Sequence, residues 1–441
     1  MQPTSFARHR LARASTAVAV VLAVIAALVL ALGVQRPAQA NTAALTQVTG
    51  FGANPGKLGM FDYVPTTAAS DAPLVIALHG CTQQAADYYN DSGWPKYADL
   101  WGFDIVFPQQ NSTNDSEDCF DWFTASDDSR GQGEAESIIQ MVDYMEAHYS
   151  INPSRVYVTG LSAGGGMTAD LLADYPDVFA SGSIDSGLPA QCATSQTQAY
   201  TCMDGSVNDS VAQWTSLATD SDPGYKGTWP TVQIWQGTAD YTVSTANSTE
   251  LMDQWTGVWG IGQTASSTAS LSGGTSESIY DNAQGKPVVE VFAISGMGHG
   301  LAVSPGSAAN QCGSTGAYFL NYICSTYYTA VYWGLNNGST TSPTASATPT
   351  KTTASPTPTQ TTGSPTPTKT TGSPSPTATG TPLSNCWTTD NVSQNLAGRS
   401  YFVGTESYAI GSNNAMGAYS STVTSSLWEP TPGYWEVVAH C

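Results

Sequence analysis

The sequence feature that most constrains the fold is a serine flanked by small residues, Gly160-Leu161-Ser162-Ala163-Gly164, between two segments of different character. Residues 156–159 form a short apolar, β-branched run typical of a buried strand, and residues 167–175 have the composition of a helix. Small residues around the serine allow the strand and the helix to approach closely through a tight turn. A strand that runs directly into a helix predicts an α/β protein.

Further apolar runs extend this pattern along the chain. A helix is predicted over residues 134–149, where Ile138, Met141, Val142 and Met145 share one face. Strands are predicted over residues 74–78, 104–108, 179–184, 232–236 and 288–294. Apolar strands separated by helices predict a mainly parallel sheet that is covered by helices on both faces.

The first 40 residues have the organisation of a signal peptide. Arg8, Arg10 and Arg13 precede an apolar run over residues 17–32, and Ala38-Gln39-Ala40 supplies small residues for cleavage. The alternative is a membrane anchor, but the run is about 16 residues long and a span needs about 20. We therefore expect secretion, with a mature chain that begins near Asn41 and has no membrane segment.

The charge of this expected mature chain excludes some classes of partner. It keeps nine basic and 34 acidic residues, a formal net charge of −25. Such a surface repels nucleic acid and anionic membranes. It suits an extracellular protein that acts, we expect as a monomer, on neutral or insoluble material.

Eight cysteines in an exported chain predict disulfides. Chain order suggests Cys81–Cys119, Cys192–Cys202, Cys312–Cys324 and Cys386–Cys441, although order alone leaves the connectivity open except for the last pair. No Cys-x-x-Cys pair occurs and no histidine has zinc-ligand spacing to a cysteine, so we expect neither a metal site nor a cofactor.

A change in composition divides the mature chain. Residues 337–384 are nearly all Ser, Thr, Pro, Gly and Ala, which cannot form a core and predict an extended linker. The linker separates a large domain, residues 41–336, from a small module, residues 385–441. The module is rich in aromatic residues, and we hypothesise that those beyond its core bind a polymer. Cys386 and Cys441 lie near its two ends and would stabilise so small a unit.

The turn at Ser162 is the sequence context of a nucleophile elbow, which holds a reactive serine above the carboxyl edge of a sheet. A serine needs a base, and His299 is the histidine that follows the last predicted strand of the large domain. The acid lies between them in chain order, and Asp240 is preferred to its rival Asp185 because it follows the later strand. The N–H of Ala163 and one from Gly80 or Cys81 are the expected oxyanion donors.

Five segments of the large domain form a distinctive set: His79-Gly80-Cys81-Thr82-Gln83, Cys119-Phe120-Asp121-Trp122-Phe123, Gly160-Leu161-Ser162-Ala163-Gly164-Gly165, Gly237-Thr238-Ala239-Asp240 and Gly298-His299-Gly300. Together they resemble the polyhydroxybutyrate depolymerase family, which is grouped with the acetylxylan and feruloyl esterases of carbohydrate esterase family one. The resemblance covers about residues 50–335. It implies an α/β-hydrolase fold, a triad of Ser162, Asp240 and His299, and oxyanion donors at Cys81 and Ala163.

The substrate does not follow from these motifs. Trp122, Trp235 and Tyr241, and also Trp94, fall in or near loops expected at the active face, where they could line a polyester groove or stack on sugar rings. We expect a polymeric ester as partner. A polyester is the first hypothesis, an acylated plant polysaccharide is the second, and a catalytically inactive polymer-binding protein is the alternative from another class.

Overall fold

The computed structural model describes residues 44–336 and, in the C-terminal region, residues 385–441 without 397–398, 404–405, 410–411, 413, 419, 421, 432–433 and 439–440. The expected signal peptide and the expected linker lie outside the described residues. Within the described ranges, no helix combines the length and the apolar character needed to cross a membrane.

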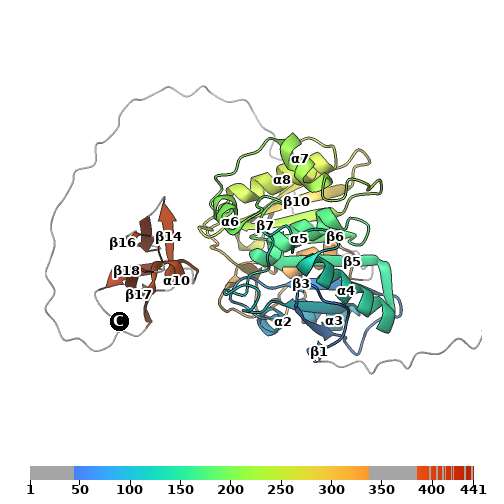
Figure 1. Ribbon diagram of the computed structural model, residues 1–441, viewed down its shortest axis with the longest axis horizontal. Helices are drawn as coiled ribbons and strands as arrows, with labels where there is room; N and C mark the ends of the chain where they lie inside the picture. Colours follow the sequence, from blue (N-terminus) through green and yellow to red (C-terminus); the bar gives the residue numbers. More distant parts are fainter. Residues whose placement is uncertain are drawn as a thin grey trace, which may run out of the picture.

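In residues 44–336, ten strands form one mixed sheet (Figure 1). The pairings in the centre of this sheet are parallel, and those at both edges are antiparallel. The prediction of a largely parallel sheet is therefore confirmed for the centre of the domain. In sheet order the strands are β1 (Thr46–Val48), β2 (Gly59–Tyr63), β4 (Asp104–Gln109), β3 (Ala72–Leu78), β5 (Ile151–Leu161), β6 (Ser181–Asp185), β7 (Thr231–Gly237), β10 (Pro287–Ile294), β9 (Thr275–Asp281) and β8 (Ser267–Leu271).

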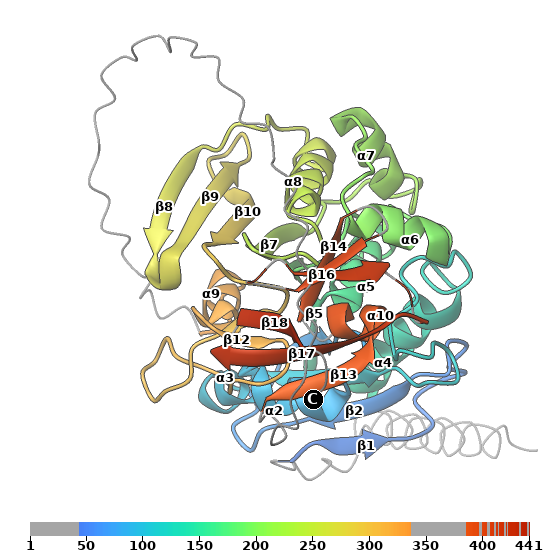
Figure 2. The same ribbon diagram turned by 90° about the vertical axis from the view of Figure 1, so that its left-hand side faces the viewer.

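Helices cover both faces of this sheet (Figures 1 and 2). Side chains of α4 (Gly133–His148), α5 (Ala163–Asp174) and α8 (Ala246–Val258) belong to the buried cluster on one face. Those of α2 (Ala85–Asp91), α3 (Trp94–Trp101) and α9 (Ser325–Tyr332) belong to the cluster on the other. The other α-helices of residues 44–336 are α6 (Gln196–Met203) and α7 (Val211–Thr219), and the short strands β11 (Leu301–Val303) and β12 (Phe319–Asn321) pair in parallel.

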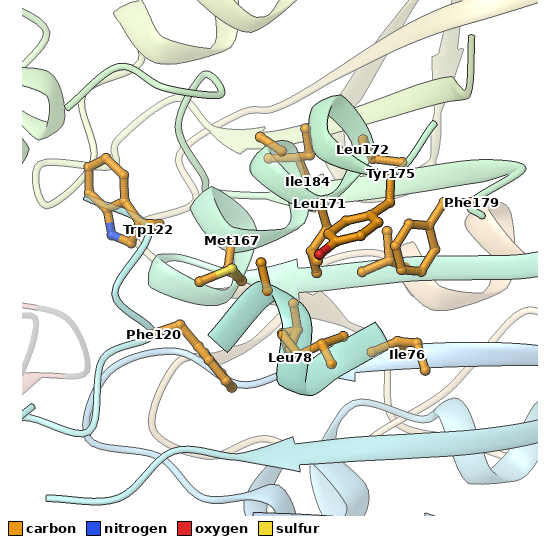
Figure 3. Packing of buried hydrophobic residues seen from close by; sticks show 14 of the residues in the cluster. Ile76, Leu78, Phe120, Trp122, Met167, Leu171, Leu172, Tyr175, Phe179 and Ile184 are labelled. Atoms are coloured by element: carbon orange, nitrogen blue, oxygen red, sulfur yellow. The ribbon is translucent and has the colours of Figure 1, made fainter. Parts of the chain in front are cut away.

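The central strand β3 explains why both faces carry helices. All seven of its residues are buried. Leu74, Ile76 and Leu78 pack on one side, whereas Val75 and Ala77 pack on the other, because successive side chains of a strand point to opposite faces. Figure 3 shows Leu78 in the first of these clusters, together with Met167 of α5. An apolar run without alternation therefore marks a strand between two helical layers.

The C-terminal module consists of two small antiparallel sheets and one short helix. Among its described side chains, Ala409, Met416, Leu427 and Trp435 form a buried apolar cluster, and a disulfide joins Cys386 to Cys441. Trp387 packs edge-on against Trp435 yet remains 40% exposed. The elements are β13 (Cys386–Asp390), α10 (Asn391–Leu396), β14 (Ser400–Val403), β15 (Glu406–Ala409), β16 (Ala415–Ala418), β17 (Thr424–Thr431) and β18 (Tyr434–Val438).

Candidate active site

Ser162 stands alone between β5, which ends at Leu161, and α5, which begins at Ala163. Its backbone has φ 57° and ψ −117°, a conformation that residues other than glycine rarely adopt. The turn is tight enough to require glycine on both sides. A Cβ on Gly160 would lie 2.1 Å from the carbonyl oxygen of Gly164, and a Cβ on Gly164 would lie 2.5 Å from the carbonyl oxygen of His79.

His299 and Asp240 are joined by a short hydrogen bond. Nδ1 of His299 donates to Oδ2 of Asp240 at 2.8 Å, and the Asp240 side chain is fully buried. Gln236 Nε2 donates to the same oxygen, and the N–H groups of Thr242 and Val243 donate to Oδ1, each at 2.9 Å. Four donors thus hold this carboxylate in one orientation, with one oxygen turned to the imidazole.

The two loops that carry this pair meet because their strands are neighbours. Strands β7 and β10 are parallel partners, so their carboxyl ends lie at the same edge of the sheet. The N–H of Ala239 donates to the carbonyl of Met297 at 2.9 Å. A Cβ on Gly237 would lie 2.3 Å from that same carbonyl oxygen, so glycine is needed for the loops to approach this closely.

Ser162 and His299 line the same small cavity, of about 30 Å³. The hydrogen bonds of the described residues include none between Ser162 Oγ and His299. Hydrogen bonds between a nucleophile and its base are often long in a free enzyme and tighten when substrate binds. The arrangement therefore provides a serine, an oriented imidazole and a buried carboxylate around one cavity.

The two expected oxyanion donors also border this region. Cys81 and Ala163 both line a cavity with Ser162. The backbone N–H of neither residue has an acceptor among the described residues. Ala163 is the first residue of α5, where helical N–H groups lack partners and attract negative charge. Both groups are thus available to an oxyanion formed on a substrate.

The loop that carries Cys81 is held by a histidine to which the sequence analysis assigned no role. His79 is fully buried; its Nδ1 lies 2.8 Å from the carbonyl oxygen of Gly80, and its Nε2 accepts the N–H of Gln110 at 3.1 Å. These partners require a neutral imidazole with its proton on Nδ1, and burial lowers the pKa of His79 to about 4. The carbonyl of Gly80 and the N–H of Cys81 belong to one trans peptide and point in opposite directions. Anchoring the carbonyl therefore aims the N–H away from His79.

Further contacts restrain this loop, among them the N–H of Gln83, which donates to the carbonyl of Gly80 at 3.3 Å, and the N–H of Thr82, which donates to the carbonyl of Glu117 at 2.6 Å. The side chain of Gln83 accepts the N–H of Gly80 at 2.8 Å, and a disulfide joins Cys81 to Cys119. The adjacent motif His79-Gly80-Cys81-Thr82-Gln83 was visible in the sequence, but the hydrogen bonds within it were not. The remaining disulfides of the large domain join Cys192 to Cys202 and Cys312 to Cys324.

The other residues predicted for the site lie at different distances from the cavities: one is buried away from His299, and two line a cavity. Asp185 is buried below Ser162, where it accepts hydrogen bonds from Thr159 and Ser183, and it makes none with His299. Trp122 lines a cavity with Ser162, and Tyr241 lines one with His299.

The expectation that Trp235 borders the substrate is not met. This side chain is 1% exposed and stacks on Phe292 at 3.7 Å within the core. Trp94 is equally buried and stacks on Trp333. Both residues lie on strand or helix faces that point into the protein, and a sequence position near a loop does not reveal that direction.

The match to known proteins decides the family. The model of the family described as esterase PHB depolymerase matches residues 58–280. The chain belongs to this family. It is 51% identical over 293 residues to poly(3-hydroxyalkanoate) depolymerase C of Paucimonas lemoignei. The aligned residues cover 66% of this chain and 70% of that protein.

Other members of the esterase group match at lower identity. Feruloyl esterase B of Talaromyces stipitatus is 35% identical over 281 residues, covering 62% of this chain and 77% of that protein. The solved structure of an acetyl xylan esterase from Aspergillus awamori has a TM-score of 0.54 and 32% identity, covering 58% of this chain and 94% of the other. This member of the PHB depolymerase family is therefore a carboxylic ester hydrolase with the α/β-hydrolase fold.

Proposed function

We propose that the chain is a secreted serine esterase that hydrolyses a polyester through Ser162, His299 and Asp240. The observation that carries this proposal is the His299–Asp240 hydrogen bond of 2.8 Å at the cavity that Ser162 also lines. The backbone conformation of Ser162 and the available N–H groups of Cys81 and Ala163 support it.

The proposed reaction has two acyl-transfer steps. Ser162 Oγ bonds to the ester carbon while its proton passes to Nε2 of His299, and the resulting oxyanion accepts hydrogen bonds from Cys81 and Ala163. The bond to the leaving alcohol then breaks, and His299 returns the proton to the alcohol oxygen. Water repeats the sequence on the acyl-enzyme and releases the acid. Asp240 orients His299 and stabilises its cationic form.

A polyester is the preferred substrate because the poly(3-hydroxyalkanoate) depolymerase is 51% identical, whereas the feruloyl esterase is 35% identical. An acylated plant polysaccharide is the second candidate, since the feruloyl and acetylxylan esterases match the same domain. We further propose that residues 1–40 direct export, that residues 41–336 form the esterase domain, and that residues 337–384 link it to the module at 385–441. Disulfides such as Cys386–Cys441 support an extracellular location.

A labelling experiment followed by a substrate panel tests the catalytic proposal. A fluorophosphonate probe should attach to the wild-type chain at Ser162 and leave the Ser162→Ala variant unlabelled. Labelled and unlabelled protein would then be assayed on polyhydroxybutyrate film, acetylated xylan and methyl ferulate. Release from the film at the highest rate, abolished by labelling, is the expected result. Labelling at another residue would contradict the mechanism, and higher rates on xylan or ferulate would contradict the polyester preference.

The C-terminal module is proposed to bind the polymer. Trp387 is 40% exposed, and Val392 and Arg399 line cavities that also contain Ser162 or His299, so the module could present polymer to the site. In the full chain, Trp387→Ala is expected to weaken adsorption to polyester film about tenfold through the lost aromatic contact. Leu100→Ala removes an exposed apolar side chain from α3 and is the control. Equal adsorption of the two variants would contradict a binding role for the module.

A further inference from the structure

Two larger cavities of different character share lining residues with the small cavity that Ser162 and His299 both line. The first, of about 220 Å³, contains Ser162 and both expected oxyanion donors but not His299. The second, of about 660 Å³, contains His299 but not Ser162. We name the first the acyl-side cavity and the second the alcohol-side cavity. This assignment of the cavities to two parts of an ester substrate rests on the proposed function.

Acyl transfer gives a substrate a fixed direction across such a site. The acyl carbon bonds to Ser162 and its oxygen faces the oxyanion donors, so the acyl substituent extends on the donor side. The leaving oxygen receives its proton from His299, so the alcohol portion extends on the histidine side. The cavity that holds the donors therefore receives the acyl group, and the cavity at His299 receives the alcohol.

The walls of the acyl-side cavity suit an apolar group. Trp122, Phe123, Leu188 and Val243 are all buried side chains that line it. Burial of aliphatic or aromatic surface against such walls is favourable, by about 25 cal/mol per Å². This cavity therefore favours acyl groups with an apolar body over free carboxylic or sugar-like groups.

The rim of the same cavity is acidic. Asp115 and Glu117 line it, and its lining contains no Lys, Arg or His among the described residues. Oδ1 of Asp115 accepts the N–H groups of Glu117 and Cys119 at 2.9 and 3.1 Å, which fixes this loop beside the Cys81–Cys119 disulfide. The alcohol-side cavity, by contrast, includes Arg399.

We propose that the acyl-side cavity accepts neutral acyl groups and that Asp115 and Glu117 reject acyl groups that end in a free carboxylate. In a hydroxyalkanoate polyester, the acyl side of every ester leads to the hydroxyl end of the chain and the alcohol side leads to the carboxyl end. The neutral hydroxyl end thus lies over the acidic rim, and the anionic end lies toward Arg399. The two cavities set the direction in which the polymer crosses the nucleophile.

The test compares p-nitrophenyl hexanoate with p-nitrophenyl hydrogen adipate, two esters of equal acyl length whose ends are a methyl and a carboxylate. For the wild-type chain we expect a kcat/KM ratio of about 10² in favour of hexanoate at low salt, since each nearby carboxylate contributes about tenfold. The ratio should fall at high salt, because salt screens the two carboxylates and leaves the apolar walls unchanged. In the Asp115→Asn/Glu117→Gln variant, which lacks both carboxylates, the ratio should fall about 10²-fold at low salt. Asn retains the Oδ1 acceptor, and a ratio measured on one preparation is independent of the folded fraction.

Two controls separate this rim from the general negative charge of the protein. Asp71→Asn/Asp281→Asn removes the same charge at residues that line neither cavity, and it should leave the ratio near the wild-type value. Moving the anion to the leaving group, in 4-carboxyphenyl hexanoate, should remove the sensitivity to Asp115 and Glu117. Equal hydrolysis of hexanoate and adipate by wild type, or an equal effect of both double variants, overturns the inference. Hexanoate hydrolysis that persists in Ser162→Ala instead overturns the proposed function.

Discussion

An Asp240→Asn variant is expected to lose about 10⁴-fold in kcat on a soluble ester, with KM little changed. Oδ1 of Asp240 accepts two backbone N–H groups, so the amide oxygen of the introduced asparagine occupies that place. Its NH₂ group then faces Nδ1 of His299 and Nε2 of Gln236, which both donate to Oδ2 in the native chain. The imidazole avoids this clash by carrying its proton on Nε2, and that nitrogen then cannot accept the proton of Ser162. Steady-state kinetics and circular dichroism measure the loss in a folded protein.

The matched control is Asp185→Asn, which should keep kcat within a few-fold because Asp185 makes no hydrogen bond with His299. Burial raises the pKa of Asp185 to about 7. The folded chain therefore binds a proton that the unfolded chain releases near pH 4, and the folded state loses stability as the pH rises from about 4 to about 7. Asparagine does not titrate, so the variant does not lose stability in this way as the pH rises. The Tm of the variant minus the Tm of wild type should therefore be larger at pH 8 than at pH 5. Loss of turnover in Asp185→Asn but not in Asp240→Asn would reverse the acid assignment.

The central sheet could be predicted because its strands are buried on both faces. Runs such as residues 74–78 and 156–159 contain little but apolar residues, and the structure places them in β3 and β5. The hairpin of β8 and β9 could not be predicted in this way. Its sequence, Ser267–Leu271 followed by Thr275–Asp281, consists mostly of Ser, Thr and charged residues, because it forms an edge with much of its surface in solvent.

For the site, the main feature that could not be predicted from the sequence was the direction in which each side chain points. Asp240 and His299 follow strands that are neighbours in the sheet, and chain order already suggested this pairing. Trp235 lies on β7 as well, but its register places it opposite Phe292 of β10. The two rings then share a face and stack inside the protein, away from the substrate cavities. The prediction for Trp235 failed because strand register depends on long-range pairing, which local composition does not encode.

His79→Gln is expected to lower kcat about 10²-fold, whereas His79→Asn should lower it about tenfold or less, with KM changed little in both. The amide of asparagine lies near the position of Nδ1, so it can still donate to the carbonyl of Gly80. The longer glutamine places its amide near Nε2, where it keeps the contact with Gln110 and loses the donor to Gly80. Without that donor the carbonyl of Gly80 keeps, among the described residues, only the longer hydrogen bond from the N–H of Gln83, at 3.3 Å, so the Gly80–Cys81 peptide is held less firmly and the N–H of Cys81 is aimed less accurately at the oxyanion. The misplaced donor corresponds to about 3 kcal/mol of transition-state stabilisation.

The two variants distinguish positioning from a purely structural role because each removes the hydrogen bonding at one of the two nitrogens of the same buried ring. If His79 only supported folding, the loss of kcat would follow the loss of Tm. The variant with the lower Tm would then also have the lower kcat. If it positions the oxyanion donor, the Gln variant loses far more kcat than the Asn variant at similar Tm. A trifluoromethyl ketone, whose adduct with Ser162 carries an oxyanion, should then bind the Gln variant about 10²-fold more weakly, while a neutral substrate analogue binds both variants alike. Equal inhibition of the two variants by the ketone would contradict a role of His79 in positioning the oxyanion donor.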